Sequence, residues 1–193
     1  MSIRTDMAAE SFFHAGGAKK LQGVKVENKV IESARLEVTD ITIETQEAAE
    51  KLGRPVGRYI TLTATDSTFD MYSDSFRERA EVVAKAIGEL CGGCERFLTV
   101  GLGNSALTSD AVGPLTAEKI FATRHIKSLA KELDTDDLGE VTVIQTGVLG
   151  STGIESSEQV KAIAERVTPQ AVIAVDALAC SELSNLGRTI QLC

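Results

Sequence analysis

The chain has 193 residues, of which 43% are hydrophobic and 25% are charged, and its formal net charge at pH 7 is −8. These values are typical of a single globular domain that is long enough to bury its own core. The acidic balance argues against direct binding to a nucleic-acid backbone, which requires clustered Lys and Arg, but not against a basic or neutral protein partner.

The N-terminal residues 1–20 are expected to be loop-like, with a flexible segment over 14–20. Charged residues within 1–17 interrupt the apolar core that a signal peptide needs. No run in the sequence approaches the roughly 18 apolar residues of a membrane span. We therefore expect a cytoplasmic protein without a membrane partner.

The next elements are predicted to include β-structure. Alternating apolar and polar residues predict half-exposed strands over 36–44 and 57–65. The segment 45–53 between them is expected to form a short helix that ends at Gly53.

A longer helix is predicted over 73–90, with Ser73 or Ser75 as its N-terminal cap. Its apolar face is formed by residues at helical spacing, namely Phe76, Ala80, Val83, Ile87 and Leu90.

The second half of the chain alternates short apolar runs with amphipathic segments. The predicted order is a buried strand over 96–102, a helix from about Asp110 to 133, a strand over 140–148, a helix over 156–167 and a second buried strand over 171–178. This alternation is typical of a parallel sheet with right-handed crossovers. The predicted fold class is therefore α/β, with a mostly parallel central sheet flanked by helices and an additional N-terminal β-rich portion.

The last residues, 187–193, resemble a strand that stops at the terminus. A natural domain seldom ends on such a strand without a closing element. We therefore expect the chain to be truncated at its C-terminal end.

Two carboxylates fall where ligands collect in an open parallel sheet, at the carboxyl ends of the strands. Asp110 follows the strand over 96–102, and Asp176 ends the one over 171–178. If these strands are neighbours, both carboxyls point into one crevice. Two carboxyls that close cannot both ionise freely. Either the pKa of one is raised, so that the pair offers an acid and a base, or the pair binds a cation. The structural alternatives are equally open: Asp110 could be the N-cap or a first-turn acid of the following helix, and Asp176 could accept hydrogen bonds from amides of the next loop.

The glycine-rich loop before Asp110 does not match a phosphate-binding motif. Gly101 and Gly103 begin a G-x-G, but Ala106 occupies the third glycine position, and the sequence has no Walker lysine. The glycines more plausibly let the backbone approach a bound chain, with Asn104 tying the loop down.

Cysteine and histidine offer little support for a metal site or a nucleophilic triad. Cys91 and Cys94 form a C-G-G-C that could be half a zinc site or a redox pair, but a helix-to-strand turn is the favoured interpretation. His14 lies in the expected flexible start, and His125, inside a predicted helix, is better explained as a surface or interface group.

Several long motifs occur in an order that resembles one known family. They are IRTDMAAES (3–11), VGLGNSALTSDAVGP (100–114), ATRH (122–125), GSTGIESSEQV (150–160), IAVDALACSEL (173–183) and NLGRTIQL (185–192). Together they resemble the spore germination proteases, endopeptidases that degrade small acid-soluble spore proteins during germination. The resemblance covers nearly the whole chain.

The resemblance implies an unusual aspartic-type endopeptidase of the spore cytoplasm, whose two essential carboxylates match Asp110 and Asp176. One, as the carboxylate, would activate a water, and the other, protonated, would polarise the scissile carbonyl or protonate the leaving amine, without any cofactor or metal. The loop residues on the substrate side match Gly101, Gly103, Asn104, Gly153 and Glu155.

The family is made as a self-processing zymogen, and the matching self-cleavage point here is between Met7 and Ala8. An acidic residue, a large apolar residue and Ala also form the Glu-(Phe/Ile/Leu)-Ala target in the spore proteins, so Asp6 and Met7 make the segment a substrate mimic. The implied organisation is a pro-segment over 1–7 and one protease domain over 8–193. The family also implies a homotetramer.

Two other functions remain open. The fold is also similar to hydrogenase-maturation endopeptidases, in which the positions matching Asp110 and Asp176 bind nickel with a later His; this chain has no His after His125. The third possibility is a truncated relative that acts as a non-catalytic binding module.

Overall fold

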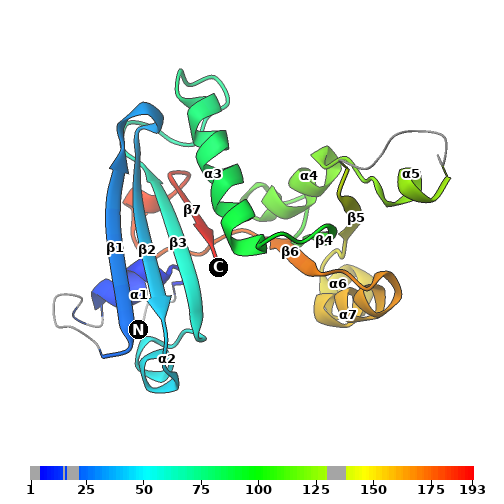
Figure 1. Cartoon of the computed structure of the whole chain (residues 1–193), viewed down its shortest axis with the longest axis horizontal. Coiled ribbons are helices and arrows are strands. Elements are labelled where there is room, and N and C mark those ends of the chain that lie inside the picture. Colours follow the sequence, from blue (N-terminus) through cyan, green and yellow to red (C-terminus); the bar gives the residue numbers. More distant parts are fainter. Residues whose placement is uncertain (1–4, 15, 17–21, 130–137) are drawn as a thin grey trace. The chain divides into compact units, whose positions relative to one another are not determined.

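The computed structural model describes residues 5–14, 16, 22–129 and 138–193 (Figure 1). The chain divides into two compact units, which we call unit 1 (Met1–Leu90 and Leu178–Cys193) and unit 2 (Cys91–Ala177). Unit 1 holds a four-stranded antiparallel sheet and unit 2 a three-stranded parallel sheet, both with helices. The predicted α/β class with a parallel sheet and an additional β-rich portion is confirmed, whereas one domain over 8–193 stays a prediction.

The sheet of unit 1 has the strand order β1-β2-β3-β7 and is antiparallel throughout. Its strands are β1 (Val24–Ile31), β2 (Leu36–Ile43), β3 (Gly57–Ala64) and β7 (Thr189–Leu192). Its helices are α1 (Ala8–His14), α2 (Gln46–Leu52) and α3 (Phe76–Cys91), with short 3₁₀ turns η1 (Glu32–Ala34) and η3 (Leu183–Asn185).

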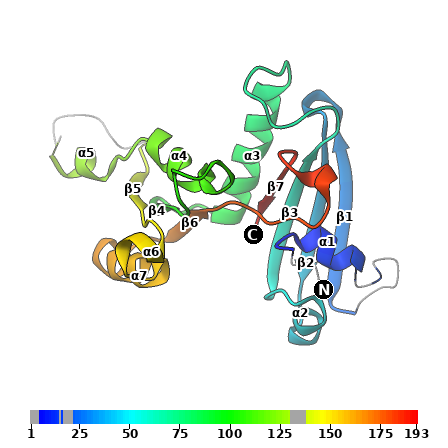
Figure 2. The ribbon, with the colours of Figure 1, turned by 180° about the vertical axis from the view of Figure 1, so that it is seen from behind.

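Side-chain alternation along the strands gives this sheet two covered faces. One face packs against α3 through a cluster that contains Val38, Ile60, Leu62 and Ala86. The other packs against α1 and α2 through a cluster that includes Ile41 of β2. Figure 2 shows α1 in front of the sheet and α3 behind it.

The sheet of unit 2 has the strand order β5-β4-β6 and is parallel. Its strands are β4 (Arg96–Gly101), β5 (Glu140–Gln145) and β6 (Ala171–Val175). Its helices are α4 (Val112–Lys119), α5 (Arg124–Leu129), α6 (Leu149–Thr152) and α7 (Ser156–Val167), with the 3₁₀ turn η2 (Thr108–Asp110). Leu98 and Val100 of the central strand β4 are fully buried.

Where local signals are strong, the sequence predictions are confirmed. The strands over 36–44 and 57–65 correspond to β2 and β3, and α7 has the predicted bounds. The α2 helix is capped by the Thr45 hydroxyl, which accepts from the Ala48 N–H, and ends at left-handed Gly53. The strand predicted within the last residues, 187–193, corresponds to β7.

Other predictions are wrong. The start of the chain is not all loop, because Ala8–His14 is helical; the expected flexible segment 14–20 lies mostly outside the described residues. The strand β1 was not predicted. The single helix expected from Asp110 to 133 is interrupted, since Ile120 after α4 has an extended backbone (φ −82°, ψ 131°).

Three further details also differ from expectation. The hydroxyls of Ser73 and Ser75 find no hydrogen-bond partner among the described residues, so neither caps α3. The predicted apolar face of α3 is largely exposed, with Phe76 at 48%, while the deepest residue of the helix is Arg79. The strand β6 is not buried as expected, since Val172 is 47% exposed.

Candidate functional site

Gly101 is the last residue of the central strand β4, and the other predicted site residues of unit 2 lie in the loops that follow its three parallel strands. Gly103, Asn104 and Asp110 follow the central strand β4, and Asp176 follows its neighbour β6. The loop after β5, the other neighbour, carries the remaining predicted residues at 153 and 155. Because parallel strands end at the same edge of a sheet, the strand order brings these three loops to one edge.

The ends of β4 and β6 are tied together by the backbone. The Leu102 N–H donates to the Val175 carbonyl at 2.9 Å. The first turn of α4 closes on both strands so tightly that a Cβ at Gly113 would overlap the carbonyl oxygens of Leu102 and Val175. A Cβ at Gly101 would likewise overlap the carbonyl oxygen of Gly113. Glycine at both positions therefore permits this close approach.

The loop between β4 and α4 is held by its own hydrogen bonds. The Asn104 N–H donates to the Asp110 carbonyl at 3.0 Å, and the Asp110 N–H donates to the Leu107 carbonyl at 2.9 Å. The Asn104 side-chain oxygen accepts from the Ala106 N–H at 3.0 Å. Asn104 therefore ties down this loop, as predicted.

Gly103 packs directly against Asp110. Its φ of +112° favours glycine, and a Cβ there would overlap the Asp110 carbonyl and lie 2.9 Å from the Asp110 carboxyl oxygen Oδ1. Glycine at position 103 therefore leaves the room that the backbone and side chain of Asp110 occupy.

The Asp110 carboxyl is not used as a helix cap. The N-cap residue of α4 is Ala111, and the cap makes no side-chain hydrogen bond. Asp110 is half-buried, and within the described residues no hydrogen bond reaches its carboxyl oxygens. The capping interpretation is therefore wrong, and the carboxyl retains its capacity to bind water or substrate.

The structure confirms the structural alternative for Asp176. Its Oδ1 accepts a hydrogen bond from the Ala177 N–H at 2.8 Å. Asp176 is exposed, although the strand over 171–178 was expected to be buried. Exposure leaves the second carboxyl oxygen open to solvent.

Gly153 and Glu155 shape the connection between α6 and α7. Gly153 ends α6 in the left-handed conformation, with φ +69°. Glu155 is the N-cap residue of α7, and its N–H donates to the Glu158 side chain at 3.1 Å. Their predicted place on the substrate side stays a prediction.

The sequence reasoning missed a hydroxyl pair in the same loop. Thr146, directly after β5, is 3% exposed, and its Oγ1 donates to the Ser156 Oγ at 3.0 Å. The Ser156 hydroxyl is also 3.3 Å from the Gly147 carbonyl, which it reaches as a donor. A Thr near the end of the predicted strand over 140–148 was the available signal.

In unit 1, the predicted self-cleavage point is buried. Met7 and Ala8 are 2% and 3% exposed. The Ala8 N–H donates to Oε1 of Gln191 on β7 at 2.6 Å, and Gln191 Nε2 donates to the Asp6 carbonyl at 3.2 Å. One side-chain amide therefore spans the predicted cleavage point.

The sequence reasoning also missed Glu10, a residue that is 6% exposed and whose carboxylate is bound by the loop around η3. It accepts from the Ser181 N–H at 2.8 Å and from the Asn185 side-chain amide at 2.7 Å. Burial raises the pKa of Glu10, but hydrogen bonds from Ser181, Thr5 and Asn185 outweigh burial and lower this pKa to about 2. Glu10 is therefore ionised at neutral pH and in mild acid.

The C-G-G-C segment is a tight turn between α3 and β4. The Cys94 N–H donates to the Cys91 carbonyl at 3.1 Å, and Gly92 and Gly93 have φ values of +49° and +81°. Both cysteines are free thiols, and burial together with the nearby Cys94 raises the pKa of Cys91. The predicted turn is confirmed.

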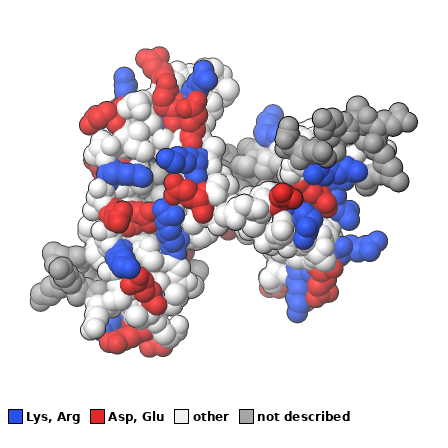
Figure 3. Space-filling model, viewed as in Figure 1, with Lys and Arg blue, Asp and Glu red and all other residues white. Residues whose placement is uncertain are grey.

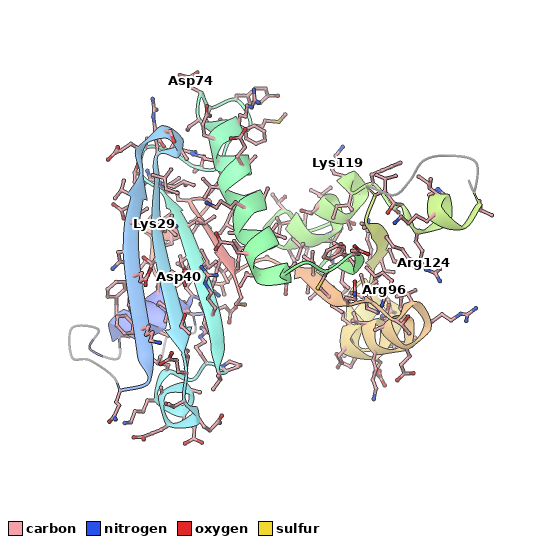
Figure 4. The ribbon with its side chains drawn as sticks, viewed as in Figure 1. Lys29, Asp40, Asp74, Arg96, Lys119 and Arg124 are labelled. Atoms are coloured by element: carbon pink, nitrogen blue, oxygen red, sulfur yellow. The ribbon has the colours of Figure 1, made fainter. Side chains whose placement is uncertain are left out.

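The charged surface is mixed in sign. Figure 3 shows acidic and basic side chains interspersed on the visible face of each unit. Lys29 and Asp40, labelled in Figure 4, lie on the sheet face that α3 covers, where Asp40 binds Arg58 at 2.7 Å. Within the described residues, no group of three or more His, Cys, Asp or Glu is placed to hold a metal ion. No helix in that part of the chain is long and apolar enough to cross a membrane.

Comparison with known proteins gives one consistent match. A family model described as germination protease matches residues 4–193. The chain is 36% identical to the germination protease of Clostridium perfringens strain ATCC 13124 over 99% of its own length and 59% of that protein. It is 34% identical to that of Clostridium tetani over 100% of the chain and 60% of the relative. It is 33% identical to the germination protease of Priestia megaterium over 99% of the chain and 54% of the relative.

The chain therefore spans 54–60% of the length of these curated relatives. The match to the family model extends over nearly the whole chain and takes in both units. The chain belongs to the germination protease family.

Proposed function

We propose that the protein to which this chain belongs is an endopeptidase that hydrolyses small acid-soluble spore proteins with the carboxyl pair Asp110 and Asp176. The observation that carries this proposal is that the two residues follow adjacent strands, β4 and β6, whose ends are joined by the hydrogen bond from Leu102 to Val175. The family membership supplies the reaction class.

In this mechanism one carboxylate accepts a proton from a water molecule as the water attacks the scissile carbonyl. The other carboxyl, protonated at the start, donates its proton to the carbonyl oxygen or to the leaving amine. The described hydrogen bonds leave the Asp110 carboxyl unengaged, while Asp176 has one oxygen bound to a backbone amide. This difference supports distinct roles for the two groups.

We further propose that the protein is made as a zymogen and cleaves itself between Met7 and Ala8. The sequence Asp6-Met7-Ala8 has the acidic, large apolar and small residues of the proposed substrate motif. N-terminal sequencing of the processed protein tests the position: a product that begins at Ala8 is expected, and one that begins at any other residue contradicts it.

The peptidase proposal is tested on the full-length protein, because the chain spans only 59% of the first relative. Wild type, Asp110→Asn and Asp176→Asn are incubated with a purified spore protein, with and without a chelator. Asp74→Asn, an exposed carboxylate of unit 1 labelled in Figure 4, is the control.

We expect both site variants to lose cleavage and Asp74→Asn to retain it, with no effect of the chelator. Loss of wild-type cleavage on chelation contradicts the carboxyl mechanism in favour of a metal-dependent one. An intact spore protein in every sample contradicts the peptidase function.

A further inference from the structure

Residues 5–10 are anchored to the rest of unit 1 by several separate hydrogen bonds. The Asp6 N–H donates to the Ala179 carbonyl at 2.8 Å, and an Arg54 guanidinium N–H donates to the Thr5 carbonyl. Gln191 binds both sides of Met7, and Glu10 binds the loop at 181–185. The anchored segment therefore includes the whole proposed processing sequence.

This docked conformation is incompatible with cleavage. The amide nitrogen of Ala8 belongs to the proposed scissile bond, and its hydrogen already pairs with Gln191 Oε1. The Met7 side chain is 2% exposed within unit 1, so no peptidase subsite can receive it without release. A buried bond is cut only from the open form, and its cleavage rate follows the population of that form when opening is fast.

We propose that Gln191 and Glu10 are positioning residues that hold Asp6–Ala8 in a shielded state and thereby set the rate of processing. This inference rests on the proposed self-cleavage, although the shielding can be measured without it. Gln191 restrains the cleavage sequence itself, whereas Glu10 anchors the first turn of α1 directly behind it.

Neither anchor changes its protonation state in mild acid. Hydrogen bonds hold the pKa of Glu10 at about 2 against the opposing effect of burial, so its carboxylate persists well below pH 5. The Gln191 amide does not titrate at all. Mild acid alone therefore leaves both anchors in place, and release requires opening of the segment.

The shielding is measured by amide hydrogen exchange over residues 5–9 in the full chain. All variants carry Asp110→Asn, so that self-cleavage does not remove the segment. Gln191→Ala is compared with Thr189→Val, which alters the same strand at a hydroxyl that has no hydrogen-bond partner in the described structure. Thermal unfolding checks that both variants fold.

We expect Gln191→Ala to raise exchange at the Ala8 amide roughly 30-fold, because it removes two hydrogen bonds that each contribute on the order of 1 kcal/mol, and every 1.4 kcal/mol is about tenfold. Thr189→Val should leave exchange unchanged. Gln191→Glu, which keeps an oxygen for the Ala8 N–H but loses the donor to Asp6, should give a smaller increase. Unchanged exchange in both Gln191 variants overturns the proposal.

A second measurement uses an unrelated broad-specificity protease added to the same proteins. Cuts within residues 5–9, read by mass spectrometry, should appear earlier in Gln191→Ala and Glu10→Gln than in Thr189→Val. Equal rates in all of them overturn the shielding.

The active full-length protein then separates this inference from the proposed function. Faster appearance of the processed form in Gln191→Ala than in the wild type supports both the proposed self-cleavage and the rate-setting role of the anchors. If exchange rises but no protein processes itself, the self-cleavage proposal fails while the shielding stands. If exchange rises but processing keeps its wild-type rate, the rate-setting role is overturned.

Discussion

Glu10 and Arg79 are the two charged residues of the described chain that are less than a tenth exposed. A buried charge is costly unless hydrogen bonds compensate it. Glu10 meets this requirement with the 181–185 loop. Arg79 does so with the carbonyls of Ala34 and Thr68, with the Asp66 carboxylate and with the ring of Phe69. Both are therefore expected to be sensitive to single substitutions.

Glu10→Gln should reduce stability in a pH-dependent way. The folded-state pKa of about 2 lies below the ordinary 4.5, so the contribution is present above pH 4.5 and is lost as the pH falls toward 2. The difference corresponds to about 3 kcal/mol at most. Urea unfolding from pH 7 to pH 2 should show that the variant has a lower free energy of unfolding at neutral pH. As the pH falls, the variant should also lose less of this free energy than the wild type does. Parallel curves for both proteins would refute this role, and Glu47→Gln serves as an exposed control.

Arg79→Met should lower the free energy of unfolding by about 3–5 kcal/mol, because it leaves the buried carbonyls of Ala34 and Thr68 without their donor and removes one of the two arginine partners of Asp66. Arg77 on the same helix provides the control. Its side chain is 87% exposed and pairs with Glu81, so Arg77→Met should cost less than about 1 kcal/mol. Denaturant unfolding compares the two, and equal losses would contradict the assigned role of Arg79.

At the scale of elements, predictions succeeded where the signal is local. The helix α2 carries its own start and stop in Thr45 and Gly53. The predicted long helix failed because of distant contacts: the Thr123 hydroxyl binds the Gly139 carbonyl and the Val141 N–H, and its backbone N–H also binds Val141. These bonds to the start of β5 hold the chain out of the helical path, and no local pattern reports them.

The loop after β4 is the element on which the candidate site depends. Gly103→Ala would place a Cβ against the carbonyl and carboxyl of Asp110. We expect a displaced Asp110 and a loss of peptidase activity of about 100-fold, since small misplacements of catalytic groups have effects of that order. Gly53→Ala is the control: its φ is +63°, but a Cβ there meets no atom within 4 Å. Comparable activity in the two variants would show that the Gly103–Asp110 contact does not matter.

At the scale of the whole molecule, the sequence predicted the fold class and the strand-end position of Asp110 and Asp176, because alternating strands and helices imply the edge at which they end. It did not predict the return of the chain after unit 2, where β7 pairs with β3. It also missed the burial of Met7 and Ala8, which depends on Gln191, 183 positions after Ala8. Pairings over such separations leave no local signal.

The central claim is that Asp110 and Asp176 act as one unit, and the double variant tests it most directly. The catalytic efficiency kcat/KM of the full-length protein on a spore protein is measured for wild type, both single Asn variants and the double variant. Each single change should lower kcat/KM by about 10²–10⁴-fold, and the double change should lose no more than the larger single loss. Single losses that multiply in the double variant, or a single variant with wild-type activity, would contradict the claim.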